Sequence, residues 1–364
     1  MAVGLPLKTT YANGDVYSAS DVNDTNGTIN ANASPYAAGK NKFLNSDFGI
    51  NQRNFTSTTT NNTYGFDRWL FETYQATGST TYSTQTFTPG TAPVSGYEGK
   101  NFARIVTTGQ TGIDAYSILQ QRIEDVRTYA GQTVTISFWA KAASGTPSIS
   151  TVANQAFGTG GSPSATTQVA VAKTAITTSW ARYSFQYAVP SISGKTIGTT
   201  ANTSYLGIYF WFSAGTAYNA PTGSLGIQTN TFDIWGMQIE NGSTATPFQT
   251  ATGTIQGELA ACQRYYFQTD AITGNDAGLA WFLGYDTGQA FGIAPITVSM
   301  RVAPTITIYN NAGTAGGANV LGSADVTGVA VSRIYKNGFN RISKTSGWAA
   351  NNQIVCWFKA EAEL

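Results

Sequence analysis

Carboxylates are the main candidates for catalytic chemistry in this sequence, because the chain contains no histidine. Without an imidazole there is no Ser-His-Asp or Cys-His system and no histidine general base. A glycosidase needs only two carboxylates that face one bond, and the candidates are Asp67, Asp114, Glu124 and Asp125. No motif pairs these residues, and an ion pair or turn at Asp67 and Arg68 is the structural alternative. We therefore expect a protein that is not an enzyme, with polysaccharide hydrolysis as an alternative.

Aromatic side chains beside turns form the second group with chemical potential, since a ring face can stack on the C–H groups of a sugar. Trp281, Tyr285, Tyr309 and Trp348 flank turns that are rich in glycine and asparagine. Binding residues concentrate on such loops when a rigid scaffold presents them. These four residues are therefore our candidate carbohydrate-binding residues. The alternative is ordinary packing, because Trp and Tyr are commonly part-buried.

Both the fraction of charged residues and the net charge of the chain are low. Charged residues make up 11% of the sequence and the net charge is +1, whereas about 25% is usual in soluble proteins. So weak a field does not attract nucleic acid, and no nucleic-acid partner is expected. No apolar run is long enough to span a bilayer, so no membrane insertion is expected. Binding should depend little on salt, because few charges are available to be screened.

Two cysteines, Cys262 and Cys356, lie in strongly apolar segments of the sequence. Free cysteine packs as a small hydrophobe, so the pattern predicts two buried thiols, with a disulfide as the alternative. The sequence has no C-x-x-C spacing, so neither a structural zinc site nor thioredoxin chemistry is expected.

Short strands are the elements that must position these side chains. In residues 133–140 every second residue is apolar, and residues 205–212 form an almost unbroken apolar run typical of a central strand. Turns containing glycine, proline or asparagine separate such runs, and this pattern indicates an antiparallel β-sandwich. Three tryptophans lie within strand patterns and are predicted to pack in the core: Trp69, Trp139 and Trp235.

The N-terminal segment, residues 1–40, differs from the rest of the chain. Ser18 can cap a short helix that places Val22 and Ile29 on one face, and an extended linker follows. A helix of about ten residues with so little apolar surface is marginal by itself. Val22 and Ile29 are therefore candidates for oligomerisation or attachment, against copies of the same chain in a trimer or against another protein.

Several motifs resemble a known family. NKFLNSDF (41–48), YGFDRW (64–69), TVTISFWAKA (133–142) and IWGMQIENGSTATPF (234–248) resemble strands of the carbohydrate-binding-module-like jelly rolls of phage tail proteins. The segments ELAACQRYY (258–266), VSMRVAPT (298–305) and KAEAEL (359–364) resemble the domain that follows this jelly roll in phage fibre-like proteins. YANGDV (11–16) resembles the attachment segment that opens many phage appendage proteins.

The resemblance implies an all-β chain in three parts. Residues 1–40 would be an attachment segment with a short helix and an extended arm. Residues 41–250 would be an antiparallel jelly-roll β-sandwich, and residues 251–364 a smaller C-terminal β domain that begins with a brief helical signal at 255–266.

The same resemblance implies a virion structural protein of the tail-fibre type, made in the cytoplasm of a bacterial host. It would attach to other virion proteins through residues 1–40 and present its β domains to a host-surface glycan. A homotrimer is a separate hypothesis, because the marginal N-terminal helix would leave Val22 and Ile29 exposed in a monomer. The alternative is a fibre or decoration protein on the capsid exterior that makes only structural contacts. A surface-polysaccharide depolymerase is the third reading.

One cofactor follows from the resemblance. In modules of this kind, carboxylates near the first and last strands often hold a structural calcium ion, and here these residues are Asp47, Asp233 and Glu240. Carboxylate oxygens are the ligands that calcium requires. The sequence has no EF-hand spacing, and solvated or hydrogen-bonded acids are the alternative. No other cofactor is expected.

Overall fold

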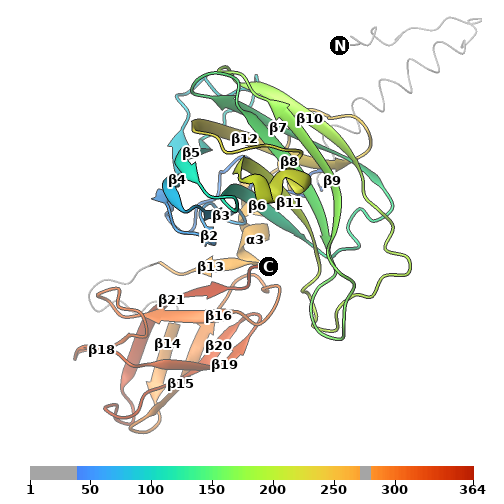
Figure 1. The fold of residues 1–364 in the computed structure, drawn as a ribbon. Coiled ribbons are helices and arrows are strands. Elements are labelled where there is room, and N and C mark those ends of the chain that lie inside the picture. Colours follow the sequence, from blue (N-terminus) through green and yellow to red (C-terminus); the bar gives the residue numbers. More distant parts are fainter. Residues whose placement is uncertain (1–38, 271–279) are drawn as a thin grey trace, which may run out of the picture.

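The computed structural model describes residues 39–270 and 280–364, and most of the regular structure in these ranges is β-strand (Figure 1). Among the described residues, no helix is both long and apolar enough to cross a membrane. The predicted N-terminal helix with Val22 and Ile29 lies outside the described residues. The predicted boundaries at residues 40 and 250 stay predictions.

Two six-stranded antiparallel sheets face each other in the first part of the structure. Sheet A has the order β1-β4-β5-β12-β7-β10, and sheet B has the order β2-β3-β6-β11-β8-β9. The chain crosses repeatedly between the two sheets, and the fold class predicted from the sequence is confirmed. The strands are β1 (Ser57–Thr58), β2 (Thr63–Tyr64), β3 (Leu70–Tyr74), β4 (Thr77–Thr86), β5 (Asn101–Thr111), β6 (Tyr116–Glu124), β7 (Thr133–Ala142), β8 (Ser148–Ala156), β9 (Thr167–Ala175), β10 (Ala181–Ala188), β11 (Tyr205–Ala214) and β12 (Asn230–Asn241).

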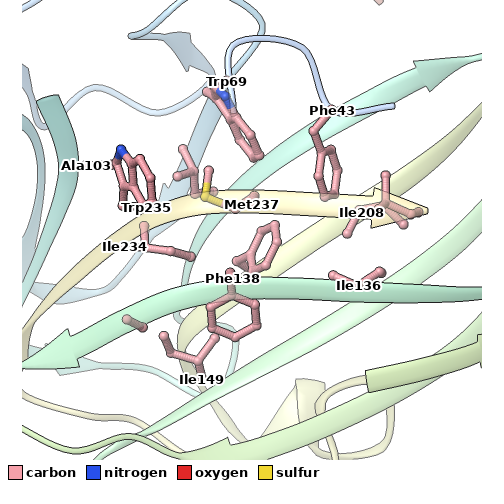
Figure 2. Close-up of a cluster of buried hydrophobic side chains, with 14 of the residues drawn as sticks. Phe43, Trp69, Ala103, Ile136, Phe138, Ile149, Ile208, Ile234, Trp235 and Met237 are labelled. Atoms are coloured by element: carbon pink, nitrogen blue, oxygen red, sulfur yellow. The ribbon is translucent and has the colours of Figure 1, made fainter. Parts of the chain in front are cut away.

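The main core fills the space between sheets A and B (Figure 2). The alternation in β7 works as predicted, because Val134, Ile136, Phe138 and Ala140 are buried on its inner face. The prediction for the tryptophans is correct for two residues, since Trp69 and Trp235 are fully buried. Trp139 is only partly buried and packs on Trp235 with ring centroids 5.8 Å apart.

The third sheet has its own core and is organised around β21 (Gln353–Glu361). This strand pairs with four others, two along each edge, so its burial holds the sheet together. The order is β18-β17-β21-β14-β15-β20-β19, and β13 and β16 also pair with β21. The remaining strands are β13 (Tyr266–Gln268), β14 (Ala280–Gly284), β15 (Gln289–Pro295), β16 (Thr305–Tyr309), β17 (Ala318–Val320), β18 (Asp325–Val326), β19 (Ala330–Tyr335) and β20 (Gly338–Ser343).

Helix α3 (Ile255–Gln263) lies between the sandwich and the third sheet (Figure 1). It begins after Thr254, whose hydroxyl accepts a hydrogen bond of 3.1 Å from the Gly257 amide, as an N-cap does. The helical signal predicted at 255–266 is confirmed over residues 255–263. Cys262 on α3 and Cys356 on β21 are both buried free thiols, as predicted.

A cluster of ion pairs joins the sandwich to the end of the third sheet, and we call it the junction. Arg68 is 2% exposed, pairs with Glu363, and lies 3.5 Å from the ring centroid of Tyr265. Arg53 also pairs with Glu363, at 3.2 Å. On the other side, Arg264 pairs with Glu124 at 2.9 Å. Because buried charges need partners, these pairs fix the two β regions against each other.

Candidate functional site

Strand β11 carries side chains of two different kinds on its two faces. Leu206, Ile208 and Phe210 point into the main core. The alternate residues Tyr209 and Trp211 point outward, where they belong to a separate small cluster. Side chains from neighbouring elements extend this outward layer. We call the set of five the aromatic face: Tyr74, Tyr116, Tyr209, Trp211 and Tyr218.

Four rings of the aromatic face contact one another, those of Tyr74, Tyr116, Trp211 and Tyr218. Tyr116 is the hub, with ring centroids 6.3 Å from Tyr74, 6.2 Å from Trp211 and 5.6 Å from Tyr218. Tyr74 is 48% exposed, whereas Trp211 is almost buried beneath its neighbours. Rings that hold each other in this way lose little freedom when a ligand binds, so the face is preorganised.

Tyr209 takes its position from a glycine. A Cβ built on Gly207 would lie 2.7 Å from the Tyr209 hydroxyl oxygen and 2.8 Å from its ring. The phenol end of Tyr209 therefore lies directly over the backbone of Gly207, which only glycine permits. The ring of Tyr209 therefore lies along β11 and does not project away from the sheet.

A row of polar side chains runs beside Tyr209 on the same face. The Gln120 amide donates to Glu72, and Arg122 donates to the Gln120 carbonyl at 3.2 Å. Arg122 also lies 3.7 Å from Glu72 and 5.1 Å from the ring centroid of Tyr205. Burial raises the pKa of Glu72 above its usual value, and Arg122 and Gln120 partly offset this. The row offers both donors and acceptors with no large net charge.

Two features border the aromatic face. The short helices η1 (Thr216–Tyr218) and α2 (Asn219–Thr222) are held over β8 and β9, where Ser150 donates to the Thr222 carbonyl at 2.9 Å and Lys173 to the Ser224 carbonyl at 2.9 Å. Next to Tyr116, a depression of about 470 Å³ is lined by residues that include Ile113 and Ile227. Helix η1 contributes Tyr218, whose ring packs against Tyr116 and Trp211 with centroid distances of 5.6 and 5.2 Å.

The four aromatic residues predicted from the sequence lie elsewhere, in the third sheet and its turns. Trp281 is 42% exposed on β14, and Tyr285 is 70% exposed just after that strand. Tyr309 on β16 is partly exposed and stacks on Trp357, with ring centroids 4.0 Å apart and planes at 10°. Trp281 and Tyr285 are thus accessible to a ligand, and one face of Tyr309 is taken by Trp357.

Trp348 is a correction to the prediction. It is 3% exposed and packs in the core of the third sheet. Its neighbours in sequence are the turn residues that suggested exposure, but the indole points inward because that core offers it apolar contacts. A buried ring has no free face for a sugar.

The three predicted calcium ligands each have separate partners. Asp233 forms an ion pair with Arg104 at 2.7 Å and lies 3.7 Å from Lys141. Glu240 pairs with Lys40 at 3.1 Å and accepts from Thr246, and these hydrogen bonds lower its pKa despite burial. Asp47 accepts a bond of 2.7 Å from the Tyr97 hydroxyl. Among the described residues, no three Asp, Glu, Cys or His side chains gather as a metal site requires.

The candidate catalytic carboxylates are also engaged separately. Asp67 is buried and accepts from Gln52, and burial raises its pKa although Arg53 lies 3.4 Å away. Glu124 belongs to the junction through Arg264. The two others lie at the surface: Asp125 pairs with Arg127, and Asp114 is exposed. None of these contacts brings two of the four carboxylates to one bond.

The sequence interpretation missed the aromatic face. The run at 205–212 was identified correctly as a central strand, since β11 lies between β6 and β8. A signal is present in its alternate positions, where Tyr205, Gly207, Tyr209 and Trp211 differ from the purely apolar residues between them, which are Leu206, Ile208 and Phe210. A strand buried on both faces would have aliphatic residues at both sets of positions.

Comparisons with known proteins give only distant structural likenesses. No protein-family model and no curated protein sequence matches the chain. Among solved structures, it is similar to a putative sugar binding protein from Bacteroides thetaiotaomicron, with 16% identity over 56% of this chain and 100% of that one and a TM-score of 0.36. A family 11 carbohydrate-binding module from Clostridium thermocellum shows 15% identity over 53% of this chain and 99% of that one, with a TM-score of 0.30.

Another match is the enzymatically active domain of tailspike protein 4 of bacteriophage CBA120. It shows 13% identity over 57% of this chain and 22% of that one, with a TM-score of 0.32. Likeness at these levels does not identify a ligand, so function is inferred from side chains.

Proposed function

We propose that the protein binds glycan chains through the aromatic face of its β-sandwich, without cleaving them. The observation that carries this proposal is Tyr209, whose ring lies flat over Gly207 beside the polar row of Glu72, Gln120 and Arg122. A pyranose presents C–H groups on one side and hydroxyls around its edge. A ring beside mixed donors and acceptors matches both at once.

The layout of the face favours an extended ligand over a single sugar. Tyr74 and Tyr116 continue the aromatic surface from β11 onto β3 and β6, with Trp211 packed beneath, and neighbouring strands lie about 4.8 Å apart. The polar row has one carboxylate and one guanidinium, which lie 3.7 Å apart. Since they neutralise each other, a neutral oligosaccharide suits this site.

Calorimetric titration with neutral oligosaccharides of host-envelope and plant type tests the proposal. We expect Tyr209→Ala to weaken binding at least tenfold, which is about 1.4 kcal/mol. Tyr335→Ala is the matched control, because it removes an exposed tyrosine on β19 of the third sheet. The proposal fails if no neutral glycan binds the full chain, or if the two substitutions weaken binding equally.

The sequence motifs suggest a more specific role, that of a phage appendage protein. Here we propose a homotrimer in the virion, attached through residues 1–40 and made in the bacterial cytoplasm, with a host-surface glycan as its ligand. Immunogold labelling of intact particles tests the location, and light scattering of the full chain tests the trimer. Labelling over the whole capsid surface would favour the alternative of a decoration protein, and release of oligosaccharide from host capsule would favour a depolymerase.

A further inference from the structure

The outer face of β14 and β15 in the third sheet exposes an unusual amount of apolar surface. Trp281, Leu283 and Ile293 are all more than two-fifths exposed, and Ile293 reaches 71%. Trp281 pairs with Ile293 across the strands, and Leu283 pairs with Phe291. These side chains therefore form one continuous surface. Contiguous exposed apolar surface of this kind marks interaction sites.

Two arginines border this surface and share one ring. The guanidinium carbons of Arg333 and Arg341 lie 5.2 Å and 5.7 Å from the ring centroid of Phe291. Tyr285, which is 70% exposed, packs edge-on against the same ring with centroids 5.8 Å apart. We call these four residues the Phe291 patch.

Neither positive charge of the patch is paired with a carboxylate of the described residues. Within residues 39–270 and 280–364, no ion pair joins either arginine to a carboxylate, and the buried Nε of Arg341 has no hydrogen-bond partner. Asp286, the carboxylate next to Tyr285 in the chain, instead accepts bonds of 2.8 and 2.7 Å from the amides of Gly288 and Gln289. The arginines of the junction, by contrast, form ion pairs, as Arg53 does with Glu363 and Arg264 with Glu124.

Backbone strain places Arg333 in the patch. Its φ of 54° lies in the left-handed region, which is unfavourable for a residue with a long side chain. The alternation of buried and exposed residues is also interrupted on the neighbouring strand β20. Phe339 and Ile342 are both buried there although they are three residues apart, whereas regular alternation buries every second residue. Strain of this kind persists where the surrounding structure enforces it, and it concentrates at functional sites.

We propose that the Phe291 patch is a second binding site, specific for carboxylated sugar residues of an acidic glycan. A guanidinium binds a carboxylate through two parallel hydrogen bonds, and two unpaired guanidiniums at one ring offer this twice. The exposed rings of Tyr285 and Trp281 supply stacking surfaces for the sugar itself. Two charges are too few for nucleic acid, which is bound through many phosphates at once.

The proposal is independent of the aromatic face, which carries a neutral ligand at a separate sheet. The experiment is calorimetric titration of the full chain with an oligogalacturonate, using the neutral galactose oligomer of the same length as the reference. We expect the uronate to bind, and the double substitution R333Q/R341Q to weaken it at least tenfold. Lys336→Gln is the matched control, since it removes one exposed positive charge from the turn between the same two strands.

Each further outcome bears on the proposal. Arg341→Lys keeps the charge but removes the planar fork, so we expect it to weaken uronate binding about as strongly as Arg341→Gln, and circular dichroism confirms folding of both. The proposal is overturned if the double variant behaves as Lys336→Gln does, or if the uronate binds no better than the neutral oligomer. It is also overturned if the arginines bind an acidic peptide or phosphatidylglycerol vesicles but no uronate. Loss of neutral-glycan binding at the aromatic face would leave these results unchanged.

Discussion

The aromatic face and the Phe291 patch use similar residues in opposite ways. On the sandwich, Trp211 and Tyr116 are packed by their neighbours, and the charges of Glu72 and Arg122 neutralise each other. On the third sheet, Trp281 and Tyr285 are exposed to 42% and 70%, and Arg333 and Arg341 have no acidic partner among the described residues. The first surface is preorganised and neutral, whereas the second is exposed and cationic.

This difference teaches that aromatic content alone does not define a ligand. What separates the two surfaces is whether the polar groups around the rings are already satisfied. A satisfied row selects a ligand by shape and hydroxyl pattern, while unpaired guanidiniums select it by charge. If the two surfaces act separately, a change at one should leave binding at the other unaffected.

The largest expected effect concerns that rigidity. Arg68→Met removes the buried cation of the junction and leaves Glu363 with Arg53 alone. We expect the free energy of unfolding to fall by about 3–5 kcal/mol, as for other broken buried pairs. Denaturant titration measures it, and the exposed Arg127→Met is the control at less than about 1 kcal/mol. Equal losses would mean that the two surfaces are not held by the junction.

Alkaline pH should loosen the same connection. Burial and the nearby Glu363 raise the pKa of Tyr64 from 10.0 to about 12, and its hydroxyl lies 3.1 Å from the Leu364 carbonyl. Burial likewise raises the pKa of Cys356 to about 12. A raised pKa in the folded state gives stability that is present below the unfolded value and lost as the pH rises through the folded one.

Stability should therefore hold up to pH 9 and fall between pH 9 and 12. By the Tyr64 shift alone the fall is about 3 kcal/mol once titration is complete. Thermal unfolding at stepwise pH measures this, with Tyr64→Phe as the variant in which the part of the fall due to Tyr64 disappears. A melting temperature that stays constant from pH 8 to 12 would contradict the assignment.

Adding a single methyl group at Gly207 should weaken binding at the aromatic face and leave binding at the Phe291 patch unchanged. In Gly207→Ala the new Cβ would overlap Tyr209, so the ring must move off the strand. We expect neutral-oligosaccharide affinity to fall about tenfold, or about 1.4 kcal/mol, with uronate affinity unchanged. Gly90→Ala lies at an open turn where nothing approaches, and its φ of 81° makes alanine unfavourable there, so it controls for a loss of stability without movement of Tyr209. Calorimetry with both ligands makes the measurement.

The converse variant at the patch is Arg333→Gly. Glycine adopts a φ of 54° without strain, so the free energy of unfolding should rise by up to about 1 kcal/mol. Uronate affinity should fall, because one guanidinium is gone. A loss of both stability and affinity would show that Arg333 has a structural role and that its strain does not serve binding.

Salt should produce the smallest difference. Between about 0.05 and 0.3 M salt the screening length shortens by about half, so uronate binding should weaken about threefold. Neutral-glycan binding should stay constant, as the low overall charge of the sequence predicts. A salt effect of equal size on both ligands would remove the distinction between the two surfaces.

Local alternation was enough to predict much of the fold. The apolar positions of β7, the central location of β11 and the helix at 255–263 all follow from neighbouring residues, and the structure confirms them. Long-range partners were beyond the reach of the sequence. Asp233 was predicted to bind calcium, but the structure pairs it with Arg104, which is 129 positions away.

The candidate sites show the same limit. Trp348 sits among turn residues yet turns into a core whose other members come from distant strands. Tyr285 and Trp281 were identified because their turns are visible in the sequence. The arginines beside them were missed, since Arg333 and Arg341 reach Phe291 only through the pairing of β19, β20 and β15.

The position of β21 sets the order in which the molecule can be assembled on the ribosome. The sandwich strands are complete once residue 241 has been synthesised. Strands β13 and β16 must wait for residues 353–361 before they have a partner, and β14 and β17, which pair with β15 and β18, wait for the same residues as their second partner. Glu363 comes later still. A nascent chain therefore carries a finished sandwich whose Arg53 and Arg68 lack this carboxylate, and the last few residues close the third sheet and the junction in one step.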